Sequence, residues 1–263
     1  MKKGIFIIII SLFYLTVPAQ ENMHPSPVQK GTIAIINAVI HVGNGQVIEN
    51  GMIVFSNGKI VDVRPTAPIA DVQVIDAKGK HVYPGIIASS TNLGLVEVGS
   101  VRATADYSEL GEMNPNIHAL YAYSADSKVI NTLRSNGILL ANIVPAGGTI
   151  SGSSSVVQLD AWNWEDAAYK TDNGIHFNMP VLSVRPNQFR RSTSSAEEAI
   201  KQGLEKVENA RKFFREAKAY NSQPAHTTIN LKYEAVKGLY NRSQSFFVHC
   251  DLLKEMMMAI DLA

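Results

Sequence analysis

The stretch that decides the fold is NGMIVFSNGKIVDV, residues 50–63. Two Asn-Gly pairs flank a short apolar run in it. Such pairs are the strongest local signal for a tight hairpin, because a type I′ turn needs a positive φ at both of its central residues. Similar short, β-rich runs separated by turn residues extend from Gly31 to Val82. We therefore expect a small antiparallel sheet over these residues.

After residue 85 the pattern changes to apolar runs that alternate with helical segments. Ser127–Ser135 is typical of a helix, and the apolar run Ile138–Val144 follows it as a strand. Farther on, Ser245–His249 predicts a strand and Leu252–Ala263 a helix. Strand, helix and strand in succession favour a parallel sheet. The fold class is therefore α/β.

A long polar helix is predicted between these segments, around residues 195–220. Ser195 followed by Glu198 makes a capping box, in which each side chain bonds a free backbone N–H of the first turn. We interpret this helix as an insertion that covers a sheet.

The N-terminus has the layout of a cleavable secretory signal over residues 1–19. A basic start precedes the apolar run Ile5–Leu15, and Val17 and Ala19 satisfy the small-residue rule for cleavage before Gln20. A retained anchor is the alternative, but the run is shorter than the ~20 residues that a spanning helix needs. We expect an exported protein, periplasmic or secreted, with no membrane association after cleavage.

Composition excludes some classes of partner and of stabilising bond. The formal net charge is +1, with charges of both signs scattered along the chain, so there is no basic surface for nucleic acid. The single cysteine, Cys250, rules out an intramolecular disulfide, and stability must come from a buried core.

Several segments occur in a fixed order along the chain. Segments 37–42, 49–54, 58–63 and 74–80 run into Pro84-Gly85-Ile86-Ile87, and segments 135–145 and 147–152 follow. This series resembles the amidohydrolase superfamily, in its exported, imidazolonepropionase-like branch. The resemblance implies that residues 20–81 form the N-terminal part of a composite β-sandwich and residues 82–263 a partial (β/α) barrel of the metal-dependent hydrolase type.

The resemblance also implies where a metal would bind. In that family the first barrel strand carries an Asp and then two histidines one residue apart, which hold a divalent metal such as zinc; here the matching positions are Ala88, Ser90 and Asn92. Neither a hydroxyl nor a carboxamide replaces imidazole on zinc. His249, which closes a strand, is similar to a later metal ligand of the family. We expect no cofactor in this chain.

The implied activity is hydrolysis of C–N bonds in cyclic amides or small peptides. A barrel of eight units takes ~250 residues, more than residues 82–263 provide. Three interpretations stay open. The chain is a fragment whose C-terminal half is supplied elsewhere, a non-catalytic binding module or partner of an active amidohydrolase paralogue, or an enzyme with a rearranged site that uses His249, Asp106 or Glu112.

Other candidate residues follow the first barrel strand. The acids Asp106, Glu109 and Glu112 lie where active-site loops of such folds are found, although a solvated surface is the simpler interpretation. With Ser90 and Asn92, Asp106 and Glu112 would line a barrel mouth able to take a small-molecule ligand.

Two further motifs have simpler explanations. The segment Gly147–Ser155 is rich in Gly, Ser and Thr but lacks the Lys of a phosphate-binding loop, so we expect a surface loop. Its serines have no G-x-S-x-G context and no nearby His and Asp in the sequence. Trp162 and Trp164 stand at the start of a predicted helix, where packing against a sheet is the usual reason for aromatic residues.

Overall fold

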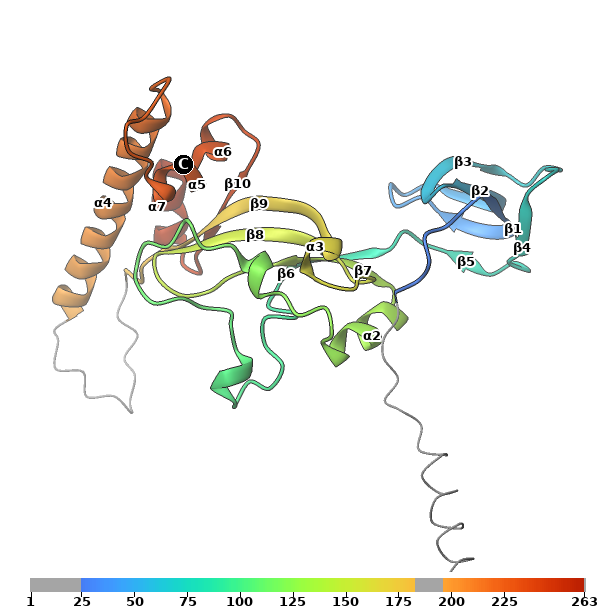
Figure 1. The fold of residues 1–263 in the computed structure, drawn as a ribbon, viewed down its shortest axis with the longest axis horizontal. Coiled ribbons are helices and arrows are strands. Elements are labelled where there is room, and N and C mark those ends of the chain that lie inside the picture. Colours follow the sequence, from blue (N-terminus) through green and yellow to red (C-terminus); the bar gives the residue numbers. More distant parts are fainter. Residues whose placement is uncertain (1–24, 183–195, 263) are drawn as a thin grey trace, which may run out of the picture.

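The computed structural model describes residues 25–182 and 196–262, which form two five-stranded sheets and a group of helices. Figure 1 shows the first sheet, in blue to cyan, set apart from the second sheet, and helices α4 to α7 gathered at the far end of the molecule. The predicted signal sequence and the capping residue Ser195 lie outside the described residues. Of the helices in the described part, none is both long and apolar enough to cross a membrane.

The first sheet has strand order β3-β2-β1-β4, with β5 also paired to β1. Strands β1, β2 and β3 are antiparallel, whereas β4 and β5 run parallel to β1. The expectation of a wholly antiparallel sheet was therefore wrong, because the chain after the hairpin crosses back and pairs with β1 in the same direction. The strands are β1 Thr32–His41, β2 Val47–Ser56, β3 Lys59–Pro65, β4 Gln73–Asp76 and β5 His81–Val82.

The predicted hairpin joins β2 to β3. Asn57 and Gly58 both have positive φ, 50° and 75°, as a type I′ turn requires. The local sequence signal is confirmed at this turn.

The second sheet has strand order β10-β9-β8-β7-β6. Strands β6 and β7 are parallel, as are β9 and β10, while β8 is antiparallel to both of its neighbours. The parallel expectation thus holds for two pairs and fails for β8. The strands are β6 Ile86–Thr91, β7 Ile138–Ile143, β8 Ile150–Gln158, β9 Ala168–Asn178 and β10 Ser245–His249.

Strand β8 takes in most of the segment that the sequence assigned to a surface loop. Residues 150–155 are buried between β7 and β9. The connection from β7 spans only residues 144–149, which is too short for a crossover, so the chain must return antiparallel. The loop prediction was wrong because small polar residues here fill a crowded interior.

The helices α2, α4 and α7 lie where the sequence predicted them. The helix expected at Trp162 and Trp164 is present as the short α3, which begins at Trp164. The α-helices are α2 Lys128–Ser135, α3 Trp164–Ala167, α4 Ala196–Asn221, α5 Leu231–Ala235, α6 Lys237–Tyr240 and α7 Leu253–Leu262; two 3₁₀ turns, η1 and η2, occupy Arg102–Thr104 and Ala119–Ala122.

Helix α4 packs against residues of the second sheet and stands at one end of the molecule (Figure 1). Ile175 and Phe177 of β9 share a buried apolar cluster with Val207 and Ala210 of α4. Side chains alternate along a strand, so His176 points to the opposite face. That face is the one that would line the interior of a barrel.

Candidate functional site

The barrel mouth is the edge at which the parallel strands end. Strands β6, β7, β9 and β10 all run in one direction, so their C-terminal ends share this edge of the sheet. Ser90 lies in β6 and Asn92 directly follows it, whereas His249 is the last residue of β10. Because β6 and β10 are the two edge strands, three strands separate Ser90 from His249.

The alternation expected for the first barrel strand is also interrupted. The register of β6 against β7 shifts between Ala88 and Thr91, the stretch that contains Ser90. Ser90 and Asn92 therefore do not form a regular i, i+2 pair on one face of β6, because Asn92 lies beyond the end of the strand.

His249 makes a close pair with a residue that the sequence did not single out. Its Nε2 lies 2.8 Å from Nδ1 of His176 on the neighbouring strand. The His176 ring stacks on both His249 and Phe247, with centroids 5.1 and 4.8 Å apart. The register of β9 against β10, which pairs His176 with Phe247, puts these three rings on one face.

Burial sets the charge of this pair. His176 is only 1% exposed, and loss of solvation together with the nearby His249 lowers its pKa to about 4. Burial also lowers the pKa of His249. Nε2 of His176 is buried and has no hydrogen-bond partner among the described residues. The pair is therefore neutral near pH 7, and one imidazole nitrogen is left without a partner.

The acids after the first barrel strand do not converge on one point. Glu112 accepts hydrogen bonds from Thr149 Oγ1 and from Lys206 Nζ of α4, each at 2.8 Å. The bonds from Lys206 and Thr149 hold the pKa of Glu112 below its usual value. The Glu109 carboxylate accepts from the neighbouring Leu110 N–H. Glu112 thus ties its loop to α4, and binding roles for Asp106 and Glu112 stay predictions.

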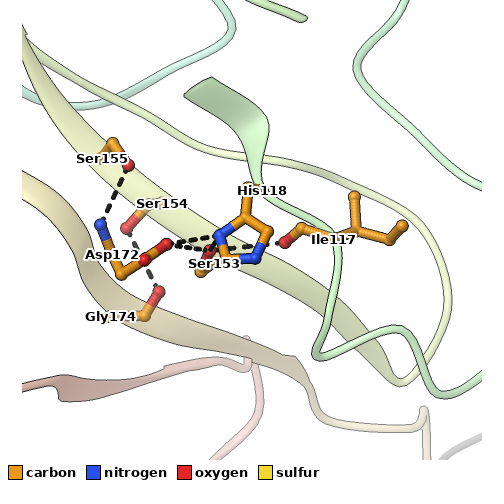
Figure 2. Close-up of polar contacts among 7 residues, drawn as sticks. All are labelled: Ile117, His118, Ser153, Ser154, Ser155, Asp172 and Gly174. Carbon is orange, nitrogen blue, oxygen red and sulfur yellow. Dashed lines mark hydrogen bonds and ion pairs between the residues drawn. The ribbon is translucent and has the colours of Figure 1, made fainter. Parts of the chain in front are cut away.

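A second polar cluster lies away from the mouth, where three elements meet (Figure 2). His118 precedes η2, Ser153 lies in β8 and Asp172 in β9. Oδ1 of Asp172 is 2.6 Å from His118 Nδ1 and accepts a hydrogen bond from Ser153 Oγ at 2.8 Å. Ser153 Oγ also lies 3.1 Å from the same His118 nitrogen.

This cluster combines the residue types of a serine hydrolase in an arrangement unsuited to that chemistry. In a catalytic triad the histidine uses one ring nitrogen for the serine and the other for the carboxylate. Here His118 Nδ1 faces both groups, and Ser153 gives its proton to Asp172. The hydroxyl is therefore not activated as a nucleophile. The cluster is a His118–Asp172 dyad held in place by Ser153.

The two members of the dyad shift each other's pKa. The hydrogen bond to Asp172 raises the pKa of His118, and the bond to His118 lowers that of Asp172. Asp172 has a positive φ of 48°, and its N–H bonds to Ser155 Oγ. Sequence reasoning missed this cluster because its members are 19 to 54 residues apart and none stands in a local motif.

The aromatic residues at the start of α3 divide between core and surface. Trp164 packs against a buried cluster and its ring lies 5.0 Å from that of Tyr121, whereas Trp162 is largely exposed. Packing against the sheet thus explains Trp164, as expected.

Comparison with known proteins supports the fold. No protein-family model and no curated protein matches the sequence. Among solved structures, an amidohydrolase from Thermotoga maritima is similar over 88% of this chain, with a TM-score of 0.73 and 18% identity. The chain spans 61% of the length of that protein. At this identity the likeness shows the fold alone, a mixed α/β architecture with a curled half-barrel sheet similar to the one in that structure.

Other matches are weaker. A prolidase complexed with N-methylphosphonate-L-proline has a TM-score of 0.44 at 14% identity, over 89% of this chain and 59% of that one. A molinate hydrolase has a TM-score of 0.42 at 15% identity, over 90% and 57%.

Proposed function

We propose that this chain is part of an amidohydrolase-like protein and does not by itself catalyse metal-dependent hydrolysis of C–N bonds. The observation that carries the proposal is the composition of the strand ends at the barrel mouth. Strand β6 brings Ser90 and Asn92 there, and β10 brings His249. A hydroxyl and a carboxamide are poor zinc ligands.

The remaining donors do not fit a zinc ion. A catalytic zinc site uses three protein ligands, commonly His, Asp or Glu, and keeps one open position. His176 and His249 supply only two imidazole side chains, which are already hydrogen-bonded to each other through one nitrogen each. Within residues 25–182 and 196–262, no group of three or more His, Cys, Asp or Glu side chains is placed to hold a metal ion. No hydrolytic step is therefore assigned to these residues.

The test is an assay of the chain beginning at Gln20 with the dipeptide Ala-Pro and with a cyclic amide, each with added zinc. We expect no turnover above that of the buffer. The double variant Ser90→His/Asn92→His should remain inactive, since restoring two ligands still leaves the centre incomplete. Zinc-dependent turnover by the unmodified chain would refute the proposal.

A second candidate function is a non-catalytic binding module at the barrel mouth. Two buried polar atoms on the strands of the second sheet, His176 Nε2 and Asn142 Oδ1, have no hydrogen-bond partner among the described residues. A buried polar atom without a partner costs about 1–3 kcal/mol, so a ligand that bonds it gains that amount. Such a ligand would be a small amide or dipeptide.

A thermal-shift screen tests the binding module. A ligand at ~100 times its dissociation constant should add ~2.7 kcal/mol of stability. We expect Asn92→Leu, at the mouth, to abolish the shift and Glu205→Gln, on α4, to leave it unchanged. Ligands whose effect survives Asn92→Leu would place the site elsewhere.

The proposal includes a protein partner that completes the barrel, either a C-terminal half or an active paralogue. Its support is the apolar surface at the β6 edge of the sheet, where Ile86, Ile87 and Leu139 are each more than half exposed. Unpaired edge strands with apolar side chains favour pairing with another polypeptide. We also propose export of the chain, on the strength of residues 1–19.

A further inference from the structure

A polar hollow of about 590 Å³ lies beside the His118–Asp172 dyad, away from the barrel mouth. It is bounded by the segment before η2, the first half of β9, helices α5 and α6, and the turn that leads into β10. Gln244, in its lining, directly precedes the first residue of β10, whereas His249 ends that strand at the mouth. The hollow and the mouth are thus at opposite ends of the strand.

His118 and Asp172 both line this hollow, and one ring nitrogen of His118 has no hydrogen-bond partner among the described residues. A carboxylate only accepts hydrogen bonds, so Nδ1 of His118 carries the proton in its 2.6 Å contact with Asp172. Figure 2 shows the other ring nitrogen turned away from Asp172 and Ser153, with no interaction drawn to it. Asp172 holds the ring through Nδ1, and its hydrogen bond raises the pKa of His118, so Nε2 is the nitrogen that donates to a ligand when the ring is protonated.

The rest of the lining offers charges of both signs. Lys237 and Glu234 line the hollow, and neither has an ion-pair partner in the part of the chain that the structure describes. Oε1 of Gln244 is buried and also has no hydrogen-bond partner among the described residues. The charge of Asp172 is already engaged by His118 and Ser153. Two cationic donors, one free carboxylate and one amide oxygen remain.

We propose that this hollow binds a small zwitterion, a free α-amino acid, with its carboxylate held by His118 and Lys237 and its ammonium by Glu234 and Gln244. A simple carboxylic acid would leave Glu234 and Gln244 without partners, and a simple amine would leave Lys237 and His118 without them. Ligand sites typically enclose about 300–1,000 Å³, so the space suffices. The proposal does not depend on whether a metal or a ligand binds at the barrel mouth.

The experiment follows the imidazole signals of His118 by NMR in the ¹⁵N-labelled chain while L-alanine is added. L-alanine at about 20 mM, well above a millimolar dissociation constant, should shift the His118 signals in a saturable way. Acetate and methylamine each carry half of the zwitterion and should bind about 10-fold more weakly, since each forfeits charge-assisted hydrogen bonds. Acetate binding as tightly as L-alanine would overturn the assignment of a zwitterion.

Lys237 is exposed and Glu234 is partly exposed, so variants at these positions need not disturb the fold. Lys237→Ala and Glu234→Gln should each weaken L-alanine binding about 10-fold or more. Lys218→Ala, a lysine on α4 outside the lining, is the matched control and should bind as the unmodified chain does. The proposal fails if L-alanine leaves the His118 signals unmoved, or if Lys237→Ala binds it with unchanged affinity.

Discussion

Replacing Gly152 by Ala should destabilise the protein, because two backbones meet at this residue. Gly152 lies in β8 with a φ of +136°, a region that side-chain-bearing residues rarely adopt. A Cβ there would lie 2.5 Å from the carbonyl oxygen of Ile117. That oxygen already accepts a hydrogen bond from Ser153 N–H at 2.7 Å, so it cannot move away without loss of this bond.

The expected cost has two parts. Forcing a residue with a side chain into such a backbone conformation costs about 1–3 kcal/mol. Crowding an atom into a packed interior costs about 1–3 kcal/mol, and here the neighbour is backbone. We therefore expect Gly152→Ala to lower the free energy of unfolding by at least about 2 kcal/mol.

Urea unfolding at fixed protein concentration, followed by tryptophan fluorescence, measures this loss. The matched control is Gly99→Ala, where a Cβ meets nothing within 4 Å and the φ is not positive. The control should change stability by less than about 1 kcal/mol, and the m-value of Gly152→Ala should stay unchanged if the native and denatured states are otherwise alike. A loss for Gly152→Ala as small as that of the control would refute the close approach of residue 117 to β8.

Two further predictions concern pH and association. The pKa of His118 is raised in the folded state, so the folded state binds the His118 proton more tightly than the unfolded state does. The stabilisation of the fold that results is complete below the ordinary pKa of histidine. It is lost as the pH rises through the raised pKa of the folded state. Asp172→Asn should remove that dependence, in urea unfolding across neutral pH; an unchanged profile would contradict it. The chain beginning at Gln20 should self-associate in light scattering, because Ile86 and Ile87 are exposed on an edge strand, and a monodisperse monomer with a cooperative thermal transition would contradict this.

Local signals account for the parts of the fold that the sequence predicted. The turn at Asn57-Gly58 depends on backbone preferences of two adjacent residues. Helix α2 shows in the periodicity of its own residues, and α4 was predicted from a capping motif at its start. Pairing between distant strands has no such signal. The parallel pairing of β4 and β5 with β1, and the antiparallel place of β8, depend on contacts made only in the folded chain.

Strand β8 shows most clearly why part of the prediction failed. Its glycines and serines suggested an exposed loop. At residue 152, however, glycine is needed because the segment that includes Ile117 packs directly against it. Gly148 is similarly approached by the carbonyl oxygen of Gly111, 2.6 Å from where a Cβ would lie. Composition alone does not distinguish small residues in a flexible loop from small residues under a crossing segment.

The same difference between local signals and contacts made only in the folded chain applies to the candidate sites. His249 was identified from its place at a strand end, a local feature, but its partner His176 was not. The His118–Asp172 dyad joins residues 54 positions apart and depends on how η2 and β9 meet. Such a site is found only once the register of the strands is known.

The measurement that tests the central claim most directly is the metal content of the purified chain beginning at Gln20. The protein is produced with zinc in the medium, dialysed exhaustively and analysed for transition metals by mass spectrometry. We predict no stoichiometric zinc, because Ser90 and Asn92 stand at the end of the first barrel strand and His176 and His249 supply only two imidazole ligands. One tightly held transition metal per chain would contradict the account.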